Sequence, residues 1–568
     1  MLRFRHSNDQ QTRREFSAIQ DATTCKAWLA TFAAFESAEN LRRVAEFIGD
    51  LVEGPLAPAR KYEMIDRVRV GLYGAARERV HDNDLRNVPL TAAEAESVWA
   101  LIDTLEDLRE AYEVLITRLA NAPIGEVFAA AVPEAGAAPT KVMALHRALD
   151  LNAHVLVLYL RMRVAVPERL WDQHCRMGQL ARQLSCQNEK VDDPLRASLT
   201  DTCREAFNLP LLLALSDPTM LSQQEFQAAY TSSSRWAGKV GYRIDSATEL
   251  GSAPARPASN PGPVIQLCSN EHQVRLDTQR VLKSIERRLD LLESGSTVQS
   301  IGLGDGVSAA TARTLLRGLV RRWGAIMPES IDFPEQLWRP SPSEFALAVT
   351  GLSQVTDGMH RQGTPAAAAS TYEYHRMRDD ALTRSHGEIE RSRIERLLED
   401  AETWSVVGET ADSVLCMRRH VRPRLSLGQL MGLKLGGKVG PIPFLLGSVQ
   451  GLQQGINDNS QGVARPASTH LVRIKLIPGL PQAVRAAVDQ VELQWVYLLV
   501  PNTPAANDEA IWEQVRADPE NYSLVLPLAS FRPARTMRVV ARGLATALRL
   551  EELVTRGLDF DHVRFKLV

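Results

Sequence analysis

Residues 91–119 read TAAEAESVWALIDTLEDLREAYEVLITRL, and this stretch indicates what the first half of the chain folds into. Thr91 and Glu94 have the spacing of a capping box, in which two side chains satisfy free backbone N–H groups at the start of a helix. Apolar residues then follow at alternating steps of three and four: Val98, Leu101, Leu105, Leu108, Tyr112, Leu115 and Leu119. The pattern predicts a long helix with one apolar seam.

The seam has two interpretations. About three heptads are too few for a free-standing coiled coil, which favours packing of this helix inside a bundle of the chain's own helices. The second interpretation is contact with a separate protein. In that case the partner-binding residues would be Leu101, Leu105, Leu108 and Tyr112.

Helical spacing continues on both sides of this segment, from about residue 16 to residue 250. Short breaks that contain Pro or Gly separate the expected helices. Further helices are expected at 142–164, 170–184, 192–215, 222–236, 271–292, 308–323 and 343–360. Without a strict repeat, we expect the N-terminal part to be a mainly α-helical body, either a bundle or an irregular solenoid.

Two stretches of different composition divide the chain. Residues 251–264 are a Pro/Ser/Ala linker, and residues 362–403 combine a flexible linker with a charged helix. The expected domains are therefore a helical domain at 1–250, a second helical subdomain at 265–361 and a C-terminal domain at 404–568. Beyond residue 404, short strand-length runs alternate with turn residues, which predicts a β-barrel or two packed sheets. The fold class is therefore α+β multidomain.

Charge and hydropathy exclude several classes of protein. Among 568 residues, 66 Lys and Arg nearly balance 68 Asp and Glu, and a net charge of −2 gives no field that would hold a nucleic-acid polymer. The first residues are polar and lack the apolar core of a secretory signal, and no apolar run reaches the ~20 residues that span a bilayer. We therefore expect a cytoplasmic protein without a membrane span.

No motif specifies a reaction or a metal site. The six cysteines include no C-x-x-C pair, and no G-x-S-x-G or H-E-x-x-H motif is present. His146, His154 and His174 lie on expected helices at offsets that do not put two imidazoles on one metal, and His174 is expected to pack beside Trp171. We therefore expect no catalytic residues, no metal and no enzymatic activity.

Arginines concentrate in two places beyond residue 404, at 418–424 and at 532–542. A guanidinium group matches a phosphate with two parallel hydrogen bonds, so arginines at strand edges suit a small anionic nucleotide. Solvated strand faces also carry arginine routinely, and that alternative stays open.

Three segments of the C-terminal part resemble PilZ-type domains, small β-barrels that bind cyclic di-GMP. The segments are WSVVGETADSVLCMRR at 404–419, LSLGQLMGLKL at 425–435 and FLLGSVQGL at 444–452. The family's D/N-x-S-x-x-G turn aligns with residues 408–413. The resemblance implies a PilZ-like barrel whose ligand-binding residues include Thr410, Ser413, Arg418 and Arg419.

The helical part is similar to long proteobacterial proteins that carry a helical body ahead of a PilZ-like end. The likeness rests on PERLWDQHCRMGQLA at 167–181 and LLALSDPTMLSQQEF at 212–226. Together the two resemblances imply a non-enzymatic signalling effector with cyclic di-GMP as its ligand, no other cofactor, and an unknown protein partner for the helical region. The alternative is a ligand-free scaffold or adaptor that acts through helical surfaces.

Overall fold

A computed structural model describes residues 9–32, 37–82, 85, 90–118, 141–192, 200–246, 264–266, 272–303, 307–324, 329–330, 345–350, 402–410, 412–419, 425–435, 445–458, 464–493, 495–501, 511–541 and 544–568. The chain divides into two compact units. The first, here called the helical unit, is Met1–Glu335 with Gly455–Ala467. The second, the β unit, is Gln336–Gln454 with Ser468–Val568. Both expected linkers fall almost entirely outside the described residues.

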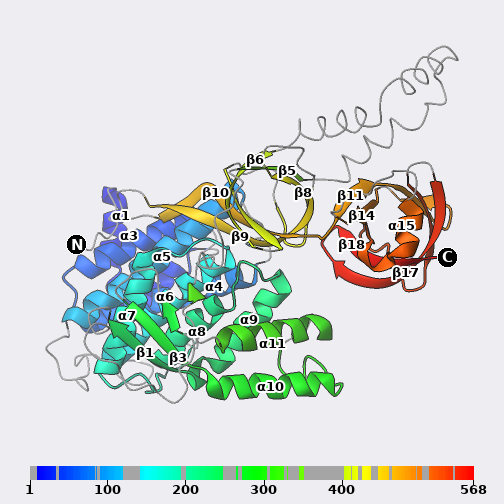
Figure 1. Cartoon of the computed structure of the whole chain (residues 1–568). Coiled ribbons are helices and arrows are strands. Elements are labelled where there is room, and N and C mark those ends of the chain that lie inside the picture. The colour runs from blue at the N-terminus through cyan, green and yellow to red at the C-terminus, as the bar shows by residue number, and fades with distance from the viewer. Residues whose placement is uncertain are drawn as a thin grey trace, which may run out of the picture. The chain divides into compact units, whose positions relative to one another are not determined.

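The helical unit is a bundle of α-helices, drawn from blue to green in Figure 1. Its described helices are α1 (Gln10–Ala18), α2 (Ala22–Leu29), α3 (Ala38–Glu53), α4 (Pro58–His81), α5 (Ala92–Arg118), α6 (Lys141–Arg161), α7 (Glu168–Gln183), α8 (Cys203–Leu215), α9 (Gln223–Trp236), α10 (Gln279–Glu293) and α11 (Ala309–Trp323). No described helix is long and apolar enough to cross a membrane.

Two helices form the centre of this bundle. The predicted capping box is confirmed at the start of α5: the Thr91 N–H donates to the Glu94 carboxylate at 2.6 Å, and the Glu94 N–H donates to the Thr91 hydroxyl at 3.3 Å. Helix α6 is buried along nearly its whole length and packs against α4, α5, α7 and α8. Several of its buried residues are polar, so they must find partners inside the protein.

Several expected helices are confirmed and others are shorter than expected. Helices α9 and α11 begin after Ser222 and Ser308, whose side chains accept a hydrogen bond from a backbone N–H in the first turn. The helix expected at 192–215 begins only at Cys203, after the N-cap Thr202.

The start of the expected helix at 271–292 is a strand. Residues His272–Asp277 form β3, and α10 follows it. Val274 and Leu276 are buried while Arg275 is exposed, which is the period of two that a strand requires. Strand β3 joins β1 (Gly241–Ser246), β2 (Val264–Gln266) and β4 (Glu329–Ser330) in a small sheet of order β1-β3-β2-β4.

The β unit contains most of the expected barrel, a closed ring of six strands in the order β10-β7-β6-β5-β8-β9 (Figure 1). Residues 455–458 of β9 and 464–467 of β10 belong to the helical unit. Its strands are β5 (Phe345–Thr350), β6 (Glu402–Glu409), β7 (Ser413–Arg418), β8 (Leu430–Leu435), β9 (Leu445–Asp458) and β10 (Ala464–Leu476). Trp404, Cys416, Leu433 and Val472 are among the side chains that fill its interior.

The helix expected at 343–360 is wrong where the structure describes it. Residues Phe345–Thr350 form β5 and pair with both β6 and β8. A six-residue apolar run fits a strand as well as a buried helix, and only the long-range pairing decides between them. The predicted domain boundary at residue 404 therefore cuts through the barrel.

The rest of the β unit is an eight-stranded sheet of order β11-β14-β15-β18-β17-β16-β12-β13. The strands are β11 (Leu480–Ala483), β12 (Arg485–Val488), β13 (Val491–Glu492), β14 (Tyr497–Val500), β15 (Ser523–Pro527), β16 (Thr536–Ala541), β17 (Leu544–Arg556) and β18 (Phe560–Leu567). Helix α15 (Ile511–Ala517) packs on it through Ile511, Trp512 and Val515. The chain is thus an α+β protein with a mainly helical N-terminal body and a C-terminal part built of antiparallel strands.

Candidate ligand-binding site

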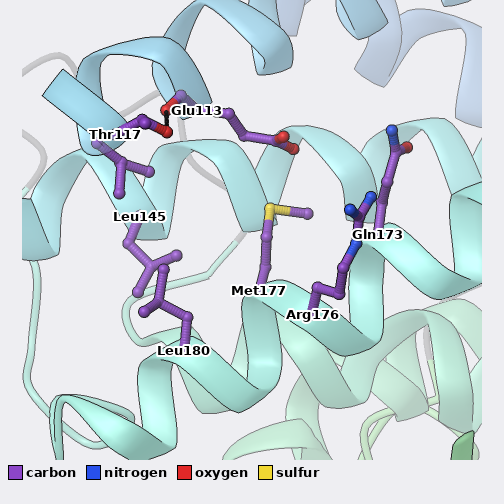
Figure 2. Close-up of a pocket in the computed structure, with 8 residues that line it drawn as sticks. Glu113, Thr117, Leu145, Gln173, Arg176, Met177 and Leu180 are labelled. Carbon is purple, nitrogen blue, oxygen red and sulfur yellow. Dashed lines mark hydrogen bonds between the residues drawn. The ribbon is translucent and has the colours of Figure 1, made fainter. Parts of the chain in front are cut away.

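A pocket of about 170 Å³ lies between α5, α6 and α7 of the helical unit. Figure 2 shows the Glu113 carboxylate near Gln173 and Arg176, with Thr117 at the other end. The remaining lining is apolar: Ile116, Leu145, Met177 and Leu180. The α7 residues belong together because positions 173, 176, 177 and 180 fall on one side of a helix. The pocket therefore combines hydrogen-bonding groups with apolar walls.

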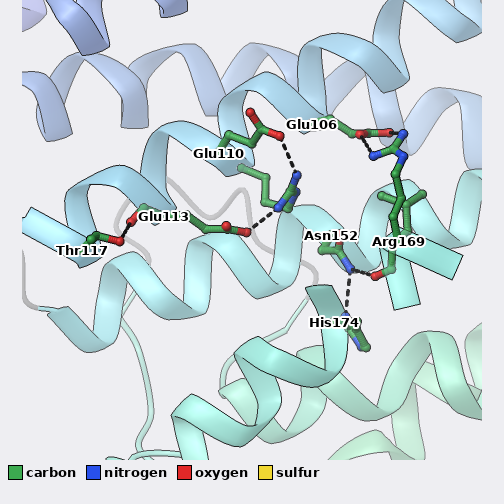
Figure 3. A network of polar contacts seen from close by, with 9 residues as sticks. Glu106, Glu110, Glu113, Thr117, Asn152, Arg169 and His174 are labelled. Carbon is green, nitrogen blue, oxygen red and sulfur yellow. Dashed lines mark hydrogen bonds and ion pairs between the residues drawn. The ribbon is translucent and has the colours of Figure 1, made fainter. Parts of the chain in front are cut away.

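The α5 wall of the pocket is held by a buried arginine. The Arg109 guanidinium bonds the carboxylate of Glu113, one turn further along α5, and lies 3.3 Å from that of Glu110 (Figure 3). The Arg109 side chain is fully buried, whereas 29% of the Glu113 side chain stays exposed. The Thr117 hydroxyl donates to the Glu113 carbonyl oxygen at 2.9 Å. Arg109 thus fixes the direction of a carboxylate that still reaches the pocket.

An ion pair joins the two helices on either side of the pocket. Arg169 of α7 contacts Glu106 of α5 through two nitrogens, at 2.5 and 3.1 Å. Such a fork geometry restrains both position and orientation. Beside this pair, burial raises the pKa of Glu110, although the nearby Arg109 opposes the rise. The pocket is therefore framed by charges that are already paired with each other.

Below the pocket, His174 is locked into one neutral form. Its Nε2–H donates to the Phe207 carbonyl oxygen at 2.9 Å, and its Nδ1 accepts from the Asn152 amide at 3.1 Å. The imidazole stacks on the Phe207 ring, and the Trp171 ring lies edge-on to it with 6.2 Å between the ring centroids. The predicted packing of His174 beside Trp171 is therefore confirmed. Burial lowers the pKa of His174 to about 4. Protonation of Nδ1 would place its N–H against the Asn152 amide N–H, from which Nδ1 now accepts a hydrogen bond.

This arrangement predicts acid sensitivity of the helical unit. Unfolded His174 takes up a proton near pH 6.5, whereas folded His174 does so only near pH 4, so its contribution to stability is complete above pH 6.5 and is lost as the pH falls toward 4. The expected loss is about 3 kcal/mol at 1.36 kcal/mol per pKa unit. Urea unfolding followed by circular dichroism at 222 nm measures it. His174→Gln should flatten the pH dependence between 6.5 and 4; an unchanged slope contradicts the assignment.

His146 and His154, the other two histidines considered in the sequence, also have internal hydrogen-bond partners. His146 Nε2 lies 3.2 Å from the hydroxyl of Thr200, which donates to the Asp150 carboxylate at 2.7 Å. The Nδ1 of His154 lies 2.9 Å from the Asp150 carbonyl oxygen, and its ring stacks on Tyr73. All of these groups are buried, which agrees with the structural interpretation of the histidines.

A buried ionic cluster connects α4, α5 and α6. The Asp66 carboxylate accepts from Arg69 at 2.6 and 3.2 Å and from the Tyr112 hydroxyl at 2.9 Å, and Arg147 Nε lies 3.6 Å away. The Arg69 and Arg147 side chains are fully buried. One carboxylate therefore faces two guanidinium groups in the core. We interpret this cluster as one that stabilises the packing of α4, α5 and α6.

The pocket residues suit binding more than covalent chemistry. Cys175 is fully buried on α7, and burial raises its pKa, which keeps it a thiol rather than a reactive thiolate. Among the described residues, no group of His, Cys, Asp and Glu is arranged to hold a metal ion. What the pocket offers is two oxygen acceptors, a guanidinium donor and apolar walls for a flat group with polar edges.

The structure places Arg418, the first predicted ligand residue, inside the barrel. Its guanidinium makes two bonds to the Glu402 carboxylate, at 2.6 and 2.7 Å, and lies over the Trp404 ring. Only 2% of its side chain is exposed. The fork of Arg418 is therefore already occupied by a carboxylate in the folded barrel, and its role in ligand binding stays a prediction.

Of the other three predicted barrel residues, Thr410 and Ser413 flank the turn between β6 and β7. The hydroxyls of Thr410 and Ser413 both donate to the Asp412 carboxylate, at 3.2 and 3.0 Å. Arg419 is exposed just beyond the end of β7. Their role in ligand binding stays a prediction. The arginines at 422, 424 and 542 lie outside the described residues.

The predicted partner-binding seam lies in the core of the helical unit. The exposed fraction of Leu101, Leu105, Leu108 and Tyr112 is 1% or less. Helix α5 packs these residues against α3, α4 and α6 of the same chain, so they have no surface left for a separate protein. The structure favours the bundle interpretation of the seam.

Sequence reasoning missed Glu113, Gln173 and Arg176. Their spacing puts them on helix faces that look like any polar helix surface, so nothing in the sequence marks them as a group. They become neighbours only when α5 and α7 pack side by side. The resemblance at 167–181 includes two of them but assigns them no role.

Comparison with known protein families gives a match in the helical unit. Residues 23–243 match a protein-family model described as "Cyclic-di-GMP receptor FimW, N-terminal domain". The match covers less than half of the chain and includes every residue that lines the pocket. No curated protein and no solved structure matches the chain. The match supports a cyclic di-GMP effector and does not extend to the barrel, so the PilZ resemblance stays a prediction.

Proposed function

We propose that this protein is a receptor for cyclic di-GMP that acts as a non-enzymatic effector. The observation that carries the proposal is the similarity of residues 23–243 to the N-terminal domain of a cyclic di-GMP receptor. This region contains the whole of α3 to α9, the core of the helical unit. The similarity is therefore to a folded body and not to a short motif.

The chemistry of the ligand agrees with what the helical unit offers. Cyclic di-GMP carries two negative charges and two guanine bases, so a receptor needs guanidinium groups for the phosphates and acceptors or donors for the base edges. The pocket between α5, α6 and α7 has both kinds of group on a helical frame held by ion pairs. Binding of the ligand then changes the stability or conformation of the helical unit, and a protein partner binds one of the two states more tightly.

Because the apolar seam of α5 is buried, the partner contact falls on another surface of the chain. The partner remains an unidentified protein in this proposal. A ligand-free adaptor is the competing function, and the titration below separates the two.

Calorimetric titration of the full 568-residue chain with cyclic di-GMP tests the receptor function. We expect a saturable heat, and we expect the free energy of unfolding in urea to rise by about 2.7 kcal/mol when the free ligand is 100 times its Kd. GMP and cyclic di-AMP serve as controls, because each lacks one part of the ligand. If cyclic di-GMP at high excess gives neither heat nor stabilisation, the receptor proposal is wrong and the adaptor function gains.

A further inference from the structure

We propose that the pocket between α5, α6 and α7 binds one guanine base of the dinucleotide, an inference that rests on the receptor function above. Guanine presents two hydrogen-bond acceptors, O6 and N7, along one edge and two donors, N1–H and N2–H₂, along the next. A specific pocket therefore needs both oxygen acceptors and N–H donors. Glu113 and Gln173 supply the acceptors and Arg176 supplies the donors, and all three lie toward the same end of the pocket (Figure 2).

The oxygen acceptors are Gln173 and Glu113. The Gln173 Oε1 atom is buried and has no hydrogen-bond partner in the part of the chain that the structure describes. A buried acceptor without a partner is unfavourable, and a base that donates to it removes the penalty. The Glu113 carboxylate lies at the same end of the pocket (Figure 2) and keeps part of its surface exposed. The two groups together match N1–H and N2–H₂.

The N–H donor is Arg176. Its side chain is exposed, and it has no ion pair with any residue that the structure describes. This distinguishes it from Arg109 and Arg169, whose guanidinium groups are held by Glu113, Glu110 and Glu106. A free guanidinium group at the rim matches the O6 and N7 edge of guanine or an adjoining phosphate oxygen.

The size of the pocket sets how much of the ligand enters it. Pockets that enclose a whole drug-sized ligand measure roughly 300–1,000 Å³. A volume of about 170 Å³ suits a single base between the apolar side chains of Leu145, Met177 and Leu180. The ribose and phosphate groups then stay outside, beside Arg176. Methionine is well suited to such a wall because its thioether packs favourably on aromatic rings.

The same geometry disfavours adenine. At the position of the guanine N1–H, adenine has a lone pair, which would point at the Glu113 carboxylate or the Gln173 oxygen. A site that is built to accept hydrogen bonds leaves its own buried groups unpaired when the analogue cannot donate, and it rejects that analogue strongly. Cyclic di-AMP should therefore bind much more weakly than cyclic di-GMP.

Three single substitutions in the full chain test the pocket. Gln173→Met removes the unpaired acceptor and keeps the size of the side chain, so the fold should be as stable as before or more so. Arg176→Gln removes the guanidinium at an exposed position. Arg182→Gln is the matched control, because Arg182 is also exposed on α7 but does not line the pocket. The Kd for cyclic di-GMP is measured by calorimetry for each variant.

We expect Gln173→Met and Arg176→Gln each to raise the Kd by about tenfold or more, and Arg182→Gln to leave it within about twofold. If the unmodified chain binds and both pocket variants bind equally well, the pocket is not the site, although the receptor function stands. If Arg419→Gln weakens binding in place of Arg176→Gln, the ligand lies on the barrel and the inference is overturned. If the unmodified chain does not bind, both proposals fail.

Discussion

Replacing Asp66 by alanine is expected to lower the free energy of unfolding of the helical unit by about 3–5 kcal/mol. The Asp66 carboxylate is bonded to Arg69 and to the Tyr112 hydroxyl and faces Arg147, and both arginines are fully buried. Its removal leaves two guanidinium charges in the core without this counter-charge. The loss of stability therefore comes mainly from the buried guanidinium charges that remain, and less from the hydrogen bonds that Asp66 made.

Urea unfolding followed at 222 nm measures this loss, because the helices dominate the signal. Asp66→Asn separates charge from shape, since it keeps an oxygen acceptor and loses the negative charge; we expect most of the loss to persist. Glu63 also lies on α4, and its carboxylate has no ion pair among the described residues. Glu63→Ala should therefore change the free energy of unfolding by no more than about 0.5 kcal/mol. Equal effects of Asp66→Ala and Glu63→Ala would contradict the proposed role of the cluster.

The second large effect is expected in the barrel, where Arg418→Ala should cost about 3–5 kcal/mol. The guanidinium of Arg418 is paired through two bonds with Glu402 and covered by Trp404. Without it, the Glu402 carboxylate stays partly buried with no cation, and the barrel interior loses the stem of a large side chain. Native-state hydrogen exchange of the amides in β6 and β7 reports the free energy of opening in this region.

The neighbouring arginine provides the control for this prediction. Arg419→Ala changes an exposed side chain and should shift the opening free energy by no more than about 0.5 kcal/mol. The double variant Glu402→Leu with Arg418→Met removes both charges and should recover most of the loss, because a buried ion pair is worth little more than well-packed apolar groups. If Arg418→Ala left exchange in β6 and β7 unchanged, the buried pair would not be what stabilises this end of the barrel.

Much of the helical unit follows from local signals in the sequence. The capping box at Thr91 and the seam that follows it predict α5 almost to the residue. Both signals depend on residues three or four positions apart, so the local sequence is enough to specify them. Strand β5 shows the opposite case. Its apolar run has no helical or strand period of its own, and its conformation is set by β6 and β8, which are distant in sequence.

The candidate site was harder to foresee for a related reason. The sequence identifies arginine as a good phosphate ligand, but it does not say whether a given guanidinium is already paired. Arg418 is occupied by Glu402, whereas Arg176 has no ion pair among the described residues. That difference depends on which acidic side chains the fold brings near each arginine. The sequence therefore predicts ligand-binding arginines in the barrel, whereas the structure favours Arg176 on α7.

The buried seam of α5 shows the same limit. A stripe of Leu and Tyr at helical spacing predicts that something packs on it, and Leu105 and Leu108 are indeed fully buried. Whether the packing partner is the same chain or another protein depends on the neighbouring helices. Here α3, α4 and α6 supply the contact.

The central claim is that cyclic di-GMP binds the helical unit at the pocket between α5, α6 and α7. Hydrogen–deuterium exchange of the full chain, with and without saturating cyclic di-GMP, tests it most directly because it locates the ligand without any substitution. We predict slower exchange in α7 and in the last turns of α5, with cyclic di-AMP giving no such change. Protection confined to β6 and β7, or no protection anywhere in the chain, would contradict the claim.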